Sequence, residues 1–266
     1  MSTADHPTSW RPPSFFGTRV RQQLVLAGAL LYLVVSVSTL NIDFHRAVAG
    51  FGRALDLFAR MLPPDFSRSQ LLIKGMVESL QMAFAATLAG VVLSVPLGIA
   101  AARNLAPRIV YLAARGIIVV GRTFHEVIIA IFFVKLFGFG PVAGLITLAF
   151  SSTIFLAKML AEDIENVRVG PIEALRATGA GFGQVVVYAV VPQVLTRSVG
   201  TAIYRLDANV RHSTIVGIVG AGGIGQTLSA SFSRYDYDFA AAILLAIIAL
   251  VALGEWFSDW VRRRLR

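Results

Sequence analysis

Long apolar runs without a charged side chain recur along this chain. A helix needs about 20 mostly apolar residues to cross the hydrocarbon core of a bilayer. On that criterion the pattern predicts six membrane-spanning helices, at residues 22–42, 79–102, 116–136, 142–164, 182–204 and 239–256. The third is the weakest, because Arg122, Glu126 and Lys135 interrupt it. We therefore expect an all-α membrane protein with about six transmembrane helices.

Residues 46–62 follow a different pattern. Arg46, Arg53 and Arg60 recur at heptad spacing, while apolar side chains occupy another face of the same predicted helix. Such an amphipathic helix typically lies in the membrane interface, although it could also pack as a cap on the other helices. The sequence thus divides into residues 1–70, with a cytoplasmic N-terminus, the first span and this helix, and residues 71–266, the main membrane domain.

The segment at residues 212–233 is uncharged and long enough to span, but glycines crowd it: Gly217, Gly220, Gly222, Gly223 and Gly225. Each glycine weakens a helix by about 1 kcal/mol relative to alanine. We therefore expect a re-entrant or broken segment, which protein or a water-filled cavity must cover.

The distribution of basic residues supports six spans rather than seven. With six, both termini and the basic stretches at 103–115 and 168–176 lie on one side, which should be the cytoplasm. A seventh span would place the arginine-rich tail at 262–266 outside. The basic segment at 46–74 falls on the outer side and is the one disagreement.

Composition supports a membrane protein and excludes several other classes. Hydrophobic residues make up 56% of the 266 residues and charged residues 15%, against about 25% charged in soluble domains. The net charge of +9 comes from residues at the ends of apolar runs, which is typical of topology signals rather than of a nucleic-acid surface. The chain has no cysteine and four isolated histidines, so we expect no metal site.

Residues 220–227 fit two nucleotide-binding signatures in part. Gly220, Gly222 and Gly225 have the dinucleotide spacing, and the stretch fits a phosphate-binding loop except that Gln226 replaces the lysine. Both signatures require a strand and a helix around them, whereas this segment lies between two predicted membrane helices. We interpret the five glycines as an outer gate, because glycine lets backbone bend and lets two copies approach closely.

A motif in the predicted cytoplasmic loop indicates a surface for a partner protein. Glu173, Ala174 and Leu175 are followed by Gly179 and then Pro192, and this spacing resembles the EAA motif of ABC importer permeases. Pro171 can begin a short helix at 172–178, and Gly179 can end it. Such a helix would present Glu173 and Arg176 to a partner, with Leu175 as an apolar anchor; a plain connector helix is the alternative.

Residues 205–225 relate the chain to one subfamily of these permeases. They are similar to the segment of phosphonate importer permeases that carries an N-x-R-x-[SA]-T pattern before a glycine-rich run. Residues 61–65 and 122–126 also resemble that subfamily, although His125 stands where proline is expected. The resemblance covers most of the chain from about Leu57 to the end.

The resemblance implies a type I ABC importer permease fold in the bacterial inner membrane. It implies a pathway formed with a second copy of the chain, two ATPase subunits that bind ATP and Mg²⁺, and an extracytoplasmic binding protein. The chain itself would bind no cofactor and would not be an enzyme. The expected solute is phosphonate or a related oxyanion such as phosphite or hypophosphite.

Polar residues inside predicted spans are candidates for the translocation pathway, since charge in a membrane is costly. They are Glu126, Lys135, Arg205, Asn209, Arg211 and Thr214. Two structural alternatives stay open: Lys135 could reach the interface from a helix end, and Arg205 could pair with Asp207. A secondary transporter driven by an ion gradient is the functional alternative, although it would need paired carboxylates at mid-membrane. An integral membrane enzyme would need a catalytic cluster, which the sequence does not suggest.

Overall fold

The computed structural model describes residues 19–40 and 44–265, and these are almost entirely helical. They form two compact units, Met1–Leu57 and Phe58–Arg266. The first contains α1 (Arg19–Thr39) and most of α2 (Phe44–Arg60). Helix α1 confirms the first predicted span, whose last residues lie outside the described part. Helix α2 is strongly amphipathic, as predicted; its place in the interface stays a prediction.

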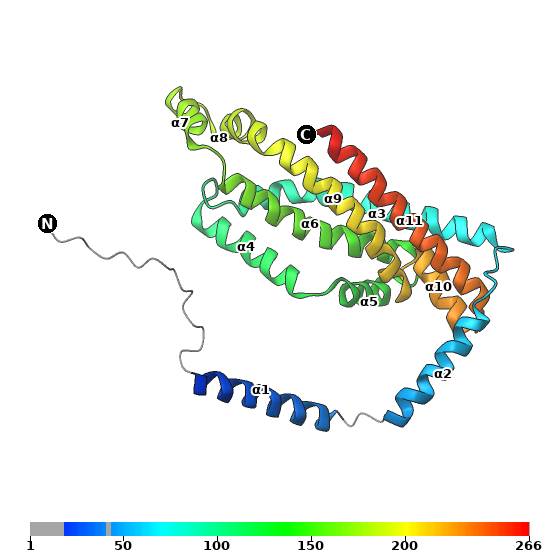
Figure 1. Ribbon diagram of the computed structural model, residues 1–266. Coiled ribbons are helices and arrows are strands. Elements are labelled where there is room, and N and C mark those ends of the chain that lie inside the picture. The colour runs from blue at the N-terminus through cyan, green and yellow to red at the C-terminus, as the bar shows by residue number, and fades with distance from the viewer. Residues whose placement is uncertain (1–18, 41–43, 266) are drawn as a thin grey trace. The chain divides into compact units, whose positions relative to one another are not determined.

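The second unit is a helical bundle (Figure 1). Its elements are α3 (Ser69–Ala100), α4 (Arg108–Thr123), α5 (Glu126–Phe137), α6 (Pro141–Glu165), α7 (Val169–Ala177), α8 (Phe182–Val185), the π-helix η1 (Val186–Val190), α9 (Val191–Ile218), α10 (Gly223–Ser233) and α11 (Tyr237–Leu265). Among the described residues, five helical stretches are long and apolar enough to span a membrane, and α4 with α5 would make a sixth span.

Helices α3 and α6 run parallel and form the centre of the bundle. Small residues on α3 allow them to approach closely. A Cβ atom built on Gly90 would lie 2.6 Å from the Ser152 Cβ, and one built on Gly98 would lie 2.9 Å from Leu160 Cδ2. In both contacts the α6 residue follows its α3 partner by the same number of positions, so the two helices run in the same direction.

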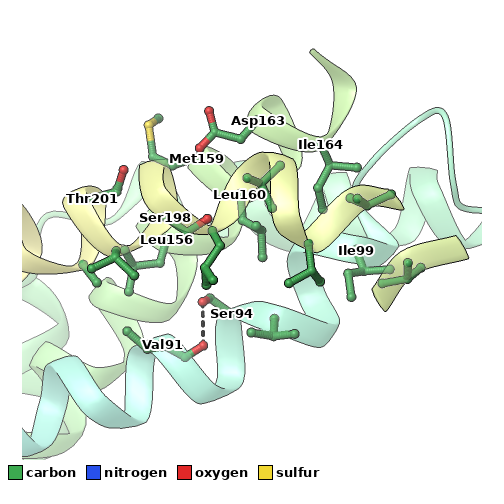
Figure 2. Close-up of a pocket in the computed structure, with 18 residues that line it drawn as sticks. Val91, Ser94, Ile99, Leu156, Met159, Leu160, Asp163, Ile164, Ser198 and Thr201 are labelled. Carbon is green, nitrogen blue, oxygen red and sulfur yellow. Dashed lines mark hydrogen bonds between the residues drawn. The ribbon is translucent and has the colours of Figure 1, made fainter. Parts of the chain in front are cut away.

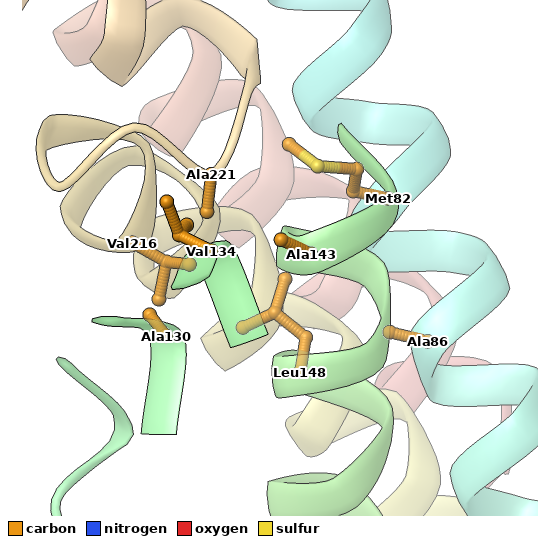
Figure 3. Close-up of a cluster of buried hydrophobic side chains, with 8 residues drawn as sticks. All are labelled: Met82, Ala86, Ala130, Val134, Ala143, Leu148, Val216 and Ala221. Carbon is orange, nitrogen blue, oxygen red and sulfur yellow. The ribbon is translucent and has the colours of Figure 1, made fainter. Parts of the chain in front are cut away.

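One hydrophobic cluster joins this centre to α5 and to the turn after α9. Figure 3 shows its eight side chains, contributed by α3, α5, α6, α9 and the following turn: Met82, Ala86, Ala130, Val134, Ala143, Leu148, Val216 and Ala221. Most of them are small, so the backbones lie close together. This cluster places the start of α6 and the glycine-rich turn side by side.

The predicted third span is not one helix. The chain bends by 91° between α4 and α5, at Phe124 and His125, which have extended backbone angles. Non-helical backbone at membrane depth is tolerated where it is buried in protein or lines a cavity. The charged residues that weakened this span in the sequence, Arg122 and Glu126, flank the break.

The fifth predicted span is longer than expected. Helical structure continues from Phe182 through α8, η1 and α9 to Ile218, so the start of the glycine-rich segment belongs to α9. The chain then turns at Val219–Gly222 and α10 folds back against the end of α9. A Cβ built on Gly225 would lie 1.9 Å from the Thr214 carbonyl oxygen, so this contact requires glycine. The segment is broken, as the sequence predicted.

Helix α11 runs antiparallel to α9 and extends beyond the predicted last span. Its C-terminal end, with Arg262, Arg263 and Arg264 in the last turn, points toward the end of the bundle where α7 and α8 lie (Figure 1). Helix α10 lies toward the opposite end. The bundle therefore has one end with α7 and another with the glycine-rich turn.

Candidate functional site

The motif Glu173–Gly179 forms helix α7 and its terminus. The helix begins at Val169, two residues before Pro171, rather than at the predicted Ile172. Proline is tolerated there because first-turn N–H groups have no partner within the helix. At the other end Gly179 has φ of +81°, its N–H donates to Arg176 O at 3.0 Å, and the Ala180 N–H donates to Leu175 O at 3.2 Å. This is a Schellman motif, which favours glycine.

The two faces of α7 have different environments. Ile172 is buried and Leu175 is half-buried, and both pack against a cluster that includes Val185 and Val190. Leu175 is thus turned toward the chain's own core, which differs from the expected apolar anchor for a partner. The exposed face carries Glu173, Ala174, Arg176 and Ala177.

Gln193 fixes the start of α7 to the start of α9, a role that the sequence did not suggest. Its amide oxygen accepts from Arg168 N at 3.0 Å, and its amide nitrogen donates to Ala189 O at 2.7 Å. The neighbouring Pro192 lacks an N–H group, and the π-helix η1 directly precedes α9 at this point. The conformation of the motif's Pro192 segment therefore determines where α7 sits.

A buried polar network connects α5, α6 and α9 in the middle of the bundle. The Arg205 guanidinium donates to Glu126 Oε1 and Ser151 Oγ at 2.8 Å each, and to Ser152 Oγ at 2.9 Å. Only 6% of the Arg205 side chain is exposed. The suggested Arg205–Asp207 pair is wrong, because side chains two residues apart on a helix do not face each other.

Asn209 and His212 extend this network along the same face of α9. Asn209 is fully buried, and its amide nitrogen donates to Thr87 Oγ1 and Ser152 Oγ at 2.8 Å. His212 Nδ1 lies 2.6 Å from Glu126 Oε2, an ion pair when the imidazole is protonated. Spacings of four and three residues along α9 place Arg205, Asn209 and His212 on one side.

The other predicted pathway residues lie elsewhere. Arg211 pairs with Asp207 of its own helix at 2.6 Å and with Glu255 of α11. Thr214 is buried beside Gly225. Lys135 is exposed in the last turn of α5. The structure thus brings Glu126, Arg205 and Asn209 together and leaves these three apart.

The sequence missed several members of the network. Ser151, Ser152, Thr87 and His212 are common polar residues on long helices, and nothing in their spacing alone relates α3 or α6 to α9. One usable signal existed, since His212 follows Asn209 by three residues and Arg205 by seven. A helical projection of α9 would have placed all three on one face.

The glycine-rich turn makes hydrogen bonds to α3 of the same chain. The Gly223 N–H donates to Glu78 Oε1 and the Ile224 N–H to Ser79 Oγ, both at 3.0 Å. A carboxylate of α3 therefore occupies the place that a phosphate takes at a nucleotide loop. All five glycines are buried within the chain, and their role as a gate stays a prediction.

Two cavities differ in chemistry. Figure 2 shows one of about 240 Å³ between α3, α6 and the start of α9, with aliphatic walls and few polar groups, among them Ser94 and Asp163. The other, of about 420 Å³, lies at the α4–α5 break. Its lining includes Arg122, His125, Glu126, Arg205 and His212, so it suits a charged solute and the first does not.

Comparison with known proteins gives a consistent assignment. The family described as "Binding-protein-dependent transport system inner membrane component" matches residues 94–266. The phosphite transport system permease protein PtxC of Stutzerimonas stutzeri is 39% identical over 226 residues, covering 85% of this chain and 82% of that protein. The phosphate-import permease protein PhnE of Mycolicibacterium smegmatis is 41% identical over 214 residues, or 80% of this chain, which spans only 40% of that protein's length.

A solved structure supports the same assignment. The inward-facing MetNI methionine ABC transporter includes a chain that aligns with a TM-score of 0.65 and 26% identity, covering 76% of this chain and 99% of that one. The matched family covers more than half of the sequence and includes α7 and all of the polar network except Thr87. The chain therefore belongs to the family of binding-protein-dependent transport system inner membrane components.

Proposed function

We propose that this chain is the channel-forming permease of a bacterial ATP-driven importer for phosphonate or a related phosphorus oxyanion, such as phosphite. The observation that carries the proposal is α7, which holds the importer motif on an exposed helix at one end of a membrane bundle. The names of the relatives, phosphite and phosphate permeases, favour the solute class. The polar cavity at the α4–α5 break fits such an anion, because arginine binds phosphate-type oxygens well.

The partners follow from this function. Two copies of the chain would form the pathway, and an ATPase subunit would dock on each α7. ATP and Mg²⁺ would bind those ATPase subunits, and a binding protein would deliver the solute at the opposite end. The C-terminal arginines share the α7 end of the bundle (Figure 1), which supports a cytoplasmic location for that end under the positive-inside rule. With α1 as a further span, both termini would be cytoplasmic.

The mechanism is alternating access. The ATPase dimer closes on ATP and carries α7 with it. Gln193 bonds the start of α7 to the start of α9, so this movement reaches α9 directly. Helix α9 continues to the polar network and the glycine-rich turn. One long element thus links the coupling surface to the pathway, and this is how ATP binding would change access.

The secondary-transporter alternative is less well supported. Carboxylate pairs at mid-membrane would be its signature, but Glu126 is held by Arg205 and His212. The family assignment favours a binding-protein-dependent importer.

Uptake by reconstituted proteoliposomes tests the proposal. With the chain, its ATPase, its binding protein and internal ATP, we expect uptake of labelled phosphite or methylphosphonate. A non-hydrolysable ATP analogue should abolish that uptake, and an ionophore should not. Uptake by the chain without an ATPase, driven by an imposed ion gradient, would contradict the proposal.

A further inference from the structure

The cavity at the α4–α5 break contains a cationic group that the polar network does not use. Within the described residues, Arg205 and Glu126 engage each other, together with Ser151 and His212. Arg122 also lines the cavity but makes no hydrogen bond or ion pair with any described residue, and its side chain is exposed. A charge in a membrane protein is costly unless it faces a partner or a water-filled cavity, so Arg122 is available for a ligand.

His125 adds a second donor beside Arg122. Its Nδ1 accepts a hydrogen bond from the Val127 N–H at 3.4 Å. Because Nδ1 accepts this bond, a neutral imidazole carries its proton on Nε2. The Nε2–H group therefore points away from the backbone of His125 and can donate to a ligand. The extended backbone at Phe124 and His125 separates this ring from the end of α4 and places it on the cavity rim.

The remaining walls define the ligand further. Ile154, Phe155 and Ile215 provide apolar surface, and the Arg205 guanidinium lies 5.4 Å from the Phe155 ring centroid. The Arg205–Glu126 pair compensates its own charge, which leaves the cavity with a net positive charge from Arg122. A cavity of about 420 Å³ accommodates a small anion that carries an organic substituent.

We propose that this cavity is an intermediate binding site for the phosphorus oxyanion in the translocation pathway. Arg122 binds two oxygens of the anion with its guanidinium fork, and His125 Nε2 donates to a third. The apolar wall takes the substituent of a phosphonate. The Arg205–Glu126–His212 group positions this wall and does not itself bind the anion. This inference rests on the proposed function, since it names the site that the solute occupies within the permease.

Equilibrium binding separates this site from the transport activity. The assembled permease–ATPase complex in nanodiscs, without the binding protein, should bind labelled methylphosphonate saturably. Arg122→Gln should weaken binding more than about tenfold, because it removes two charge-assisted hydrogen bonds, and His125→Gln about tenfold, because it removes one. Arg122→Lys should retain part of the affinity. Arg108→Gln is the control, because Arg108 is exposed on the same helix but outside the cavity.

Uptake assays on the same variants give the second measurement. Arg122→Gln should reduce ATP-driven uptake about tenfold at saturating loaded binding protein, with a normal elution profile for the complex. Wild-type uptake together with unchanged binding in Arg122→Gln would contradict the proposed binding site and leave the importer function intact. Saturable binding that depends on Arg122, in a complex without ATP-driven uptake, would support the proposed binding site and contradict the proposed importer function.

Discussion

Replacing Gly179 with valine is expected to lower coupled transport about tenfold or more while the chain still inserts and folds. Gly179 adopts a φ of +81°, a conformation that costs an L-residue about 1–2 kcal/mol and a β-branched one more. A Cβ here would contact nothing within 4 Å, so the effect comes from the backbone and not from a clash. A changed terminus would alter the angle of α7, whose exposed face should meet the ATPase.

The measurement compares uptake and substrate-stimulated ATPase activity of the reconstituted complex. Gly179→Asn is the matched control, since asparagine tolerates positive φ. Gly179→Trp adds bulk on the exposed side and should be at least as severe as valine. Normal stimulation of ATPase activity in the tryptophan variant, or an asparagine variant as defective as valine, would show that the conformation of Gly179 does not set the coupling.

Replacing Arg205 with leucine is expected to cost about 3–5 kcal/mol of folding free energy, which is typical when one partner of a buried ion pair is removed. The Arg205 side chain is 6% exposed and that of Glu126 is 17% exposed. Without the guanidinium, Glu126 keeps Ser151 and His212 but loses its permanent positive partner. The free energy of unfolding of the purified chain in detergent provides the measurement.

Two further variants make the Arg205 result interpretable. The double variant Arg205→Leu with Glu126→Gln should be less destabilised than the sum of the single variants, because it leaves no unpaired charge. Arg197→Leu removes an arginine from the same helix whose side chain is 71% exposed and whose partner Asp163 is 12% exposed, so the expected loss is smaller than that for Arg205, where both partners are buried more deeply on average. Equal losses for Arg197 and Arg205 would contradict the network.

The apolar pattern was sufficient to predict where most of the helices lie. Span length is a local property that the bilayer sets, so α6 starts and ends within one residue of its predicted limits. The same pattern could not reveal the 91° bend after α4, since a hydropathy window averages across Phe124 and His125. The charges near this point weakened the predicted span without showing that the chain changes direction there.

The contacts of the candidate site were predictable only within one helix. Asp207 and Arg211 are four residues apart and pair, as helical spacing indicates. Arg205 instead pairs with Glu126, on a distant helix, and this depends on how α9 is rotated against α5 and α6. Close contacts between helices, such as that of Gly90 on α3 with Ser152 on α6, are likewise visible only once the helices are packed.

Site-directed crosslinking tests the central claim most directly, namely that α7 docks an ATPase. The chain has no cysteine, so Ala174→Cys on the exposed face of α7 would be its single thiol. In the assembled complex this thiol should form a crosslink to the ATPase subunit, and the yield should change when ATP binds. Ser233→Cys, exposed at the end of α10, should crosslink to the binding protein or to nothing. A crosslink to the ATPase from Ser233→Cys, with none from Ala174→Cys, would contradict the account.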